Sequence, residues 1–129
     1  MDAEAGTVGA GVKPSRKPRK NCNAGDRAHM ARVAELGCIV CFNLGRGYIA
    51  AEIHHLKTNP LSGLHLGLGQ RASHKHTIPL CPDHHRGGHG IGYHGGPWEF
   101  ARRYGTEVEL FRQVCRMLLH EYGDAPDQE

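Results

Sequence analysis

A chain of 129 residues with 39% hydrophobic and 22% charged residues has room for one small domain of ordinary composition. It contains no run of 18 apolar residues, which excludes a membrane-spanning helix. Its first residues lack a signal-peptide pattern, so we expect a cytoplasmic protein whose five cysteines are free or bound to metal rather than joined in disulfides.

Residues 1–22 are rich in Gly, Ala and Pro and then basic, which predicts a disordered tail. Within residues 1–20, five basic side chains oppose two acidic ones, whereas residues 21–129 are neutral overall. The tail either contacts nucleic acid or is simply solvated, and the sequence leaves both interpretations open. We expect the folded domain over residues 23–123 and a disordered C-terminus over residues 124–129.

The first regular element expected is a helix over residues 26–36, DRAHMARVAEL. Asp26 can cap its N-terminus, and Gly37 stands where a left-handed residue commonly ends a helix. The following residues 38–47, CIVCFNLGRG, predict a tight turn of the zinc-knuckle type.

Two short strands and a short helix are expected next. Residues 48–55 predict a strand that ends in a His-His pair, and residues 76–80 predict a second strand after a long glycine-containing loop. Pro82 suits the first turn of a helix, which Gly87 and Gly88 must end early. The order predicts a ββα arrangement within a small, loop-rich α+β fold.

The C-terminal third is more regular. Residues 97–105, PWEFARRYG, suit a short helix, and Thr106 with Glu109 can form the capping box of a longer one. The longer helix carries an apolar stripe at 3.6-residue spacing that should cover the core. The stripe comprises Phe111, Val114, Cys115, Leu118, Leu119 and Tyr122. His29 and His120 are expected on the surface and have no assigned function.

Four residues have the spacing of a tetrahedral zinc site. Cys38 and Cys41 form C-x2-C, and Cys81 and His84 form C-x2-H; two such pairs are the usual source of structural zinc ligands. A zinc ion there would tie the knuckle to the start of the short helix. The alternative is a Cys38–Cys41 redox pair, which calls for a thioredoxin-like βαβ setting that the sequence lacks.

Five further histidines accompany these pairs, namely His54, His55, His85, His89 and His94. In a ββα arrangement, a second cation would lie between the end of the first strand and the helix. Histidine-rich, partly open coordination is typical of catalytic metal sites, because one position must remain for water or substrate. The alternative is that several of these histidines only pack or cap.

The pattern CIVC…EIHH…IPLCPDHH…H resembles the HNH nucleases, the ββα-metal group, and more closely the phage and prophage proteins of the Ref (recombination enhancement function, RecA-dependent nuclease) and YbcO type. The resemblance runs from about residue 28 to residue 120 and includes GQRASHKHTIPLCPDHHRGG and WEFARRYGTEVEL. It implies an HNH-like fold and metal-dependent endonucleolytic cleavage of DNA in phage recombination. It also implies a RecA-like recombinase filament as partner and a bacterial or phage-infected cell as the setting.

The resemblance also assigns roles. By this resemblance, the four Cys and His residues already described bind structural Zn2+. His54 and His85 ligate an active-site divalent cation, Mg2+, Mn2+ or Zn2+, and His55 is the general base. The third ligand is His94 by the Ref pattern, with His89 as the substitute if an H-x3-H helix applies.

The sequence leaves two questions open. In HNH enzymes the asparagine of the motif should stand five residues before the position of Cys81. This chain has His76 there, so the residue that orients His55 is undetermined. The competing function is a zinc-stabilised nucleic-acid-binding module without catalysis. That module needs only the cysteine-containing site and leaves the accompanying histidines unexplained.

Overall fold

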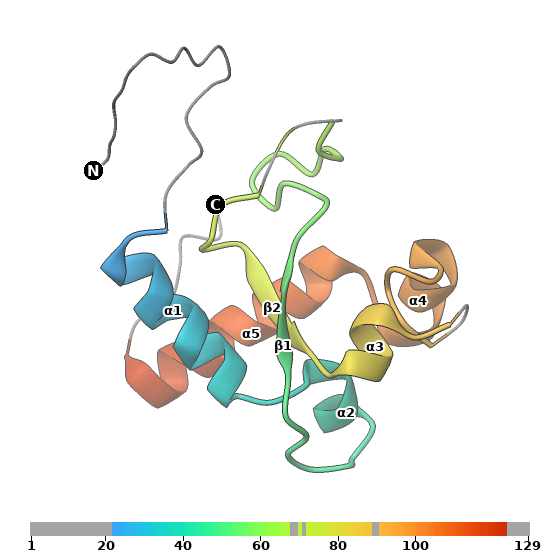
Figure 1. The fold of residues 1–129 in the computed structure, drawn as a ribbon, viewed down its shortest axis with the longest axis horizontal. Helices are drawn as coiled ribbons and strands as arrows, with labels where there is room; N and C mark the ends of the chain where they lie inside the picture. The colour runs from blue at the N-terminus through green and yellow to red at the C-terminus, as the bar shows by residue number, and fades with distance from the viewer. Residues whose placement is uncertain (1–21, 68–69, 71, 89–90, 124–129) are drawn as a thin grey trace, which may run out of the picture.

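The structure is a computed structural model that describes residues 22–67, 70, 72–88 and 91–123. The expected tail lies outside the described residues except for Cys22, and so do the expected C-terminus at 124–129 and His89. Within the described residues the chain forms five helices and two strands, in the order α1, α2, β1, β2, α3, α4, α5 (Figure 1). The predicted α+β class is thus confirmed.

Helix α1, Ala24–Glu35, begins with a complete capping box. The Asn23 side chain accepts a hydrogen bond from the Asp26 amide at 2.7 Å, and the Asp26 carboxylate accepts one from the Asn23 amide at 3.4 Å. Asn23 is therefore the cap, and the prediction of Asp26 in that role was wrong by three residues. Gly37 has φ 80°, as expected after a helix, and a Cβ there would lie 2.7 Å from the Tyr48 ring.

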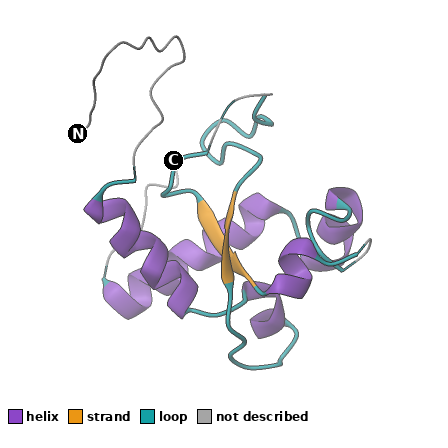
Figure 2. Cartoon of the chain, in the orientation of Figure 1, coloured by secondary structure: helices purple, strands orange, loops and turns teal. Residues whose placement is uncertain are grey.

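Strands β1, Glu52–His55, and β2, Thr77–Leu80, pair antiparallel, with His54 opposite Ile78 and His55 opposite Thr77. The predicted first strand was too long, because the four residues of β2 leave residues 48–51 without a pairing partner. The connection between the strands is loop apart from an isolated bridge in its described part (Figure 2).

Helix α5, Glu107–Tyr122, starts at the predicted capping box and passes behind the strands, with α1 beside them (Figure 1). Four of the six residues expected on the stripe are buried, which confirms most of it; they are Phe111, Val114, Cys115 and Leu118. The inclusion of Leu119 and Tyr122 was wrong, since they are 57% and 41% exposed. His29 was also misplaced: it is 7% exposed, one helical turn from the fully buried Val33.

Three shorter helices position the candidate site. They are α2, Ile39–Asn43, α3, Pro82–Arg86, and α4, Pro97–Tyr104. Helix α3 follows β2 directly and contacts both strands, which completes the predicted ββα unit. Among the described helices, none combines the length and apolar character that crossing a bilayer requires.

Candidate metal centres

The first cluster consists of Cys38, Cys41, Cys81 and His84, all buried. The sulfur atoms of Cys41 and Cys81 are 3.8 Å apart, and the three sulfurs lie 3.2–3.6 Å from His84 Nδ1. Zinc bonds of about 2.3 Å to sulfur and 2.05 Å to nitrogen give tetrahedral edges of roughly 3.8 Å between sulfurs and roughly 3.6 Å between sulfur and nitrogen. The cluster therefore has the dimensions of a tetrahedral zinc site.

Electrostatics favour a cation in this cluster. Burial raises the pKa of the Cys38 thiol to about 12. Burial, together with the nearby Arg46, lowers the pKa of His84. Both shifts favour the neutral forms of Cys38 and His84, and a bound dication would favour the ionised thiol. With four protein donors and no exposed member, the set fits a structural metal better than a catalytic one.

The second cluster brings together His54, His85 and His94, whose ligand atoms all lie within 4.8 Å of one another. Their ring centroids are 4.8–5.3 Å apart. His54 is buried, His85 is half-buried and His94 is exposed, so the cluster opens toward solvent on the His94 side. Burial and the neighbouring His54 and His85 lower the pKa of His94, which favours its neutral, metal-binding form.

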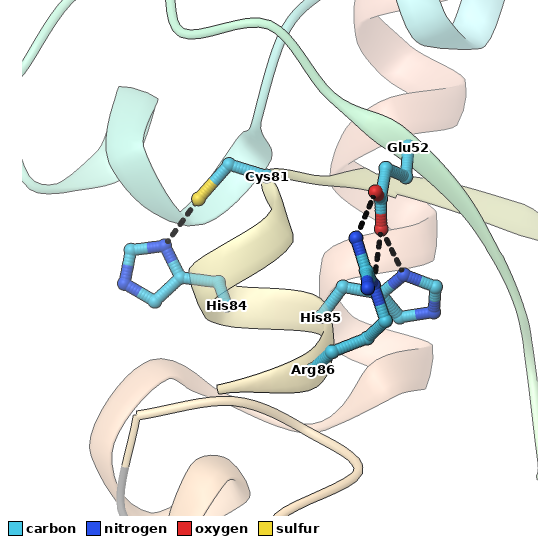
Figure 3. A network of polar contacts seen from close by, with 5 residues as sticks. All are labelled: Glu52, Cys81, His84, His85 and Arg86. Carbon is cyan, nitrogen blue, oxygen red and sulfur yellow. Dashed lines mark hydrogen bonds and ion pairs between the residues drawn. The ribbon is translucent and has the colours of Figure 1, made fainter. Parts of the chain in front are cut away.

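One short helix serves both clusters. Successive residues of α3 are rotated by about 100°, so adjacent histidines point in different directions. Figure 3 shows His84 beside Cys81 on one side of the helix and His85 directed toward Glu52 on the other. The His-His pair that follows Pro82 therefore contributes one donor to each cluster.

His94 reaches the cluster because the glycine-rich segment after α3 folds back onto that helix. The amide of Tyr93 donates to His84 O at 2.9 Å, and the amide of His94 donates to His85 O at 3.1 Å. A Cβ on Gly92 would lie 2.3 Å from Gly87 N, so this close approach excludes a side chain. Helix α3 ends at Arg86, before the position that an H-x3-H helix would need.

Two carboxylates contact histidines of the second cluster. Glu52 Oε1 lies 2.9 Å from His85 Nδ1, and the Glu52 carboxylate accepts two hydrogen bonds from Arg86 (Figure 3). The hydrogen bonds from Arg86 and His85 lower the pKa of Glu52 to about 2. Glu107, buried at the first position of α5, lies with Oε2 2.5 Å from His54 Nε2. Two ring orientations are thus fixed by carboxylates, as in the outer shell of many metal sites.

His55 lies outside the converging trio. Its neighbour His54 belongs to that trio, and successive strand residues point to opposite faces of the sheet. His55 Nε2 is 3.0 Å from His74 Nδ1. His76, which occupies the place of the HNH asparagine, packs its ring edge-on against Phe111 at 5.5 Å. His74 is therefore a loop side chain that contacts His55.

The comparisons with known proteins agree with this geometry. A family model described as recombination enhancement, RecA-dependent nuclease, matches residues 22–119. The chain belongs to this family of RecA-dependent nucleases. No curated protein sequence matches the chain. The match to the RecA-dependent nucleases includes every residue of both clusters, together with Glu52 and Glu107. The chain is therefore a nuclease of recombination that acts on DNA.

Sequence reasoning missed three side chains of this RecA-dependent nuclease. Glu52 and Glu107 contact the clustered histidines, and His74 contacts the neighbouring His55. The only local signal was for Glu52, which stands two residues before His54 and so shares its strand face. Glu107 lies at the start of α5 and His74 in the loop between the two strands, and neither position has a comparable local signal. Their roles depend on contacts across 33, 19 and 53 residues of sequence.

We expect Gly92→Ala in this nuclease to displace His94. The added Cβ meets the Gly87 backbone, and overpacking of this kind costs about 1–3 kcal/mol of stability. Cation binding by the three histidines should weaken, while the cysteine-containing cluster keeps its metal. Metal content and thermal melting measure both effects. Gly88→Ala is the matched control, since a Cβ there meets nothing within 4 Å; equal metal binding by the two variants would contradict the prediction.

Proposed function

We propose that this nuclease is an HNH-type, metal-dependent endonuclease that hydrolyses phosphodiester bonds of DNA in phage recombination. The observation that carries the proposal is the convergence of His54, His85 and His94 beside a ββα unit, separate from the cysteine-containing cluster. A binding module stabilised by zinc needs only the first cluster. A second, partly exposed set of three imidazoles suits a site that must admit substrate.

Each residue of the site has a proposed role. Cys38, Cys41, Cys81 and His84 hold structural Zn2+, and His54, His85 and His94 hold a divalent cation, Mg2+, Mn2+ or Zn2+. When bound, that cation supplies Lewis-acid stabilisation of the charge that develops on the phosphoryl and leaving oxygens. Glu52 and Glu107 keep the rings of His85 and His54 oriented. Exposed His94 forms the side of the site that faces the DNA.

His55 is the proposed general base. Imidazole is the side chain best suited to accept a proton near neutral pH, and such base catalysis contributes roughly 10²–10⁴-fold to a rate. His55 lies next to a proposed ligand on β1 without belonging to the metal-binding trio, so it can take a proton from water. As the water oxygen attacks phosphorus, the bond from phosphorus to the 3′ oxygen breaks, and the leaving 3′ oxygen takes up a proton from solvent.

The function is tested by plasmid nicking with Mg2+, Mn2+ or Zn2+, with and without a RecA filament, beside elemental analysis of bound metal. We expect two metal equivalents per chain and cleavage that depends on the second. Failure to cleave duplex or single-stranded DNA with any of these ions, even on a RecA filament, would favour the zinc-stabilised binding module.

His74 should act as a positioning residue for His55. The 3.0 Å contact between the two rings restricts rotation of His55, and loss of such positioning commonly costs on the order of 10²-fold in rate. We expect His74→Ala to reduce nicking about 10–100-fold with both metals retained. His65→Ala, in the same loop and exposed, is the control and should nick like the parent. If His74→Ala cleaves at the parent rate, His55 is oriented by other contacts.

A further inference from the structure

We infer that Glu107 is a positioning residue that fixes the tautomer of His54, so that Nε2 carries the proton and Nδ1 is presented to the active-site cation. The inference rests on the proposed function for the identity of that cation. It begins from a buried carboxylate that the zinc cluster does not use and that no local sequence pattern required.

The contacts of Glu107 are those of an acceptor only. Its residue is 5% exposed, and both carboxylate oxygens accept hydrogen bonds from the Lys57 backbone amide, at 3.0 and 2.9 Å. A backbone amide can only donate, so the carboxylate is held with its oxygens toward the start of the loop after β1. The same Oε2 lies 2.5 Å from His54 Nε2.

The chemistry of imidazole then decides the tautomer. A carboxylate oxygen accepts hydrogen bonds, so His54 Nε2 must donate to it. Neutral imidazole carries one N–H, and its other nitrogen has the lone pair that a metal needs. Nδ1 is therefore the ligand atom of His54. Glu107 is not one of the three side chains whose ligand atoms converge, so it acts through His54 rather than on the cation.

The fold makes Glu107 a rigid support. It is the first residue of α5, whose start is fixed by the reciprocal hydrogen bonds of Thr106 and Glu109 and whose buried face lies in the core. The ring centroid of Tyr93, which directly precedes His94, lies 4.5 Å from that of His54. A support held by a long, packed helix keeps a ligand in place better than a loop residue does.

Glu107→Leu is the informative change, because it removes the acceptor that faces His54 Nε2. Without that acceptor His54 is no longer held in the Nε2–H tautomer, and a proton on Nδ1 blocks the ligand atom. Glu107→Gln is the matched control at the same position. Glu107 Oε2 accepts from both the Lys57 amide and His54 Nε2, so an amide oxygen in its place keeps both contacts.

Two measurements test the inference on zinc-loaded full-length protein. Long-range 1H–15N NMR should show the Nε2–H tautomer of His54 in the parent and in Glu107→Gln, and loss of this tautomer preference in Glu107→Leu. Titration with Co2+ should show second-site affinity reduced 10–100-fold in Glu107→Leu alone, with one zinc retained in all three proteins.

The parent protein alone can overturn the inference, even if Glu107→Leu fails to fold, because an Nδ1–H tautomer of His54 contradicts it directly. If a second Co2+ binds to the parent and to Glu107→Leu with equal affinity, the inference is also overturned. If the parent shows the Nε2–H tautomer, Glu107→Leu loses it, and no second Co2+ binds to either, then the positioning role of Glu107 stands and the proposed function fails.

Discussion

Cys41→Ser is expected to release the zinc and abolish the cooperative unfolding transition of the domain. Cys41 Sγ lies 3.8 Å from Cys81 Sγ and 3.5 Å from His84 Nδ1, so it joins α2 to α3 across 40 residues of sequence. Structural zinc supplies on the order of 10 kcal/mol to a small domain, which is comparable to the about 5–15 kcal/mol of a whole domain's stability. Elemental analysis and calorimetry measure the two losses.

Cys22→Ser is the control for this experiment. It makes the same chemical change at a cysteine that lies just before α1, away from the cluster, and it should keep both zinc and melting temperature. A Cys41→Ser protein that retains its zinc and melts like Cys22→Ser would contradict the structural assignment. Loss of a redox activity with no change in zinc content would instead favour the Cys38–Cys41 redox pair.

Local signals predicted the parts of the fold that short-range chemistry controls. The Thr106–Glu109 capping box and the 3.6-residue stripe located α5 to its first residue, because both depend on residues within one or two turns. The C-x2-C and C-x2-H spacings likewise placed four donors correctly, since each pair needs only a helix cap and its first turn to converge.

Sequence periodicity alone could not predict features that depend on a distant partner. Residues 48–51 were predicted as strand, yet they lie outside the sheet because β2 ends where Cys81 begins the turn into α3. His29 is buried because α1 turns that face toward the sheet and α5, which helix periodicity in so short a segment does not reveal. The contact from Glu107 to His54 spans 53 residues, so it follows from the tertiary fold and from no local motif.

The second large effect is expected from substitutions of the candidate-site histidines, which should impair metal binding or cleavage separately. We expect His55→Ala to keep both metals, the fold and DNA binding while losing about 10²–10⁴-fold in nicking rate, because a base acts on water and need not touch the ion. His85→Ala and His94→Ala should lower second-site metal affinity by at least the 10–100-fold that loss of an outer-shell partner costs, while the zinc remains. Metal content and nicking rate are measured side by side.

His120→Ala is the control, since this histidine is exposed in the last turn of α5, and it should match the parent in both measurements. The comparison of metal content with nicking rate assigns each histidine its role. If His55→Ala loses the second metal, then His55 is a metal ligand rather than the general base, although it lies outside the converging trio. If His94→Ala retains the second metal while His89→Ala loses it, the ligand set follows the H-x3-H pattern, and the backbone pairing of His94 with His85 serves only to close the glycine-rich segment.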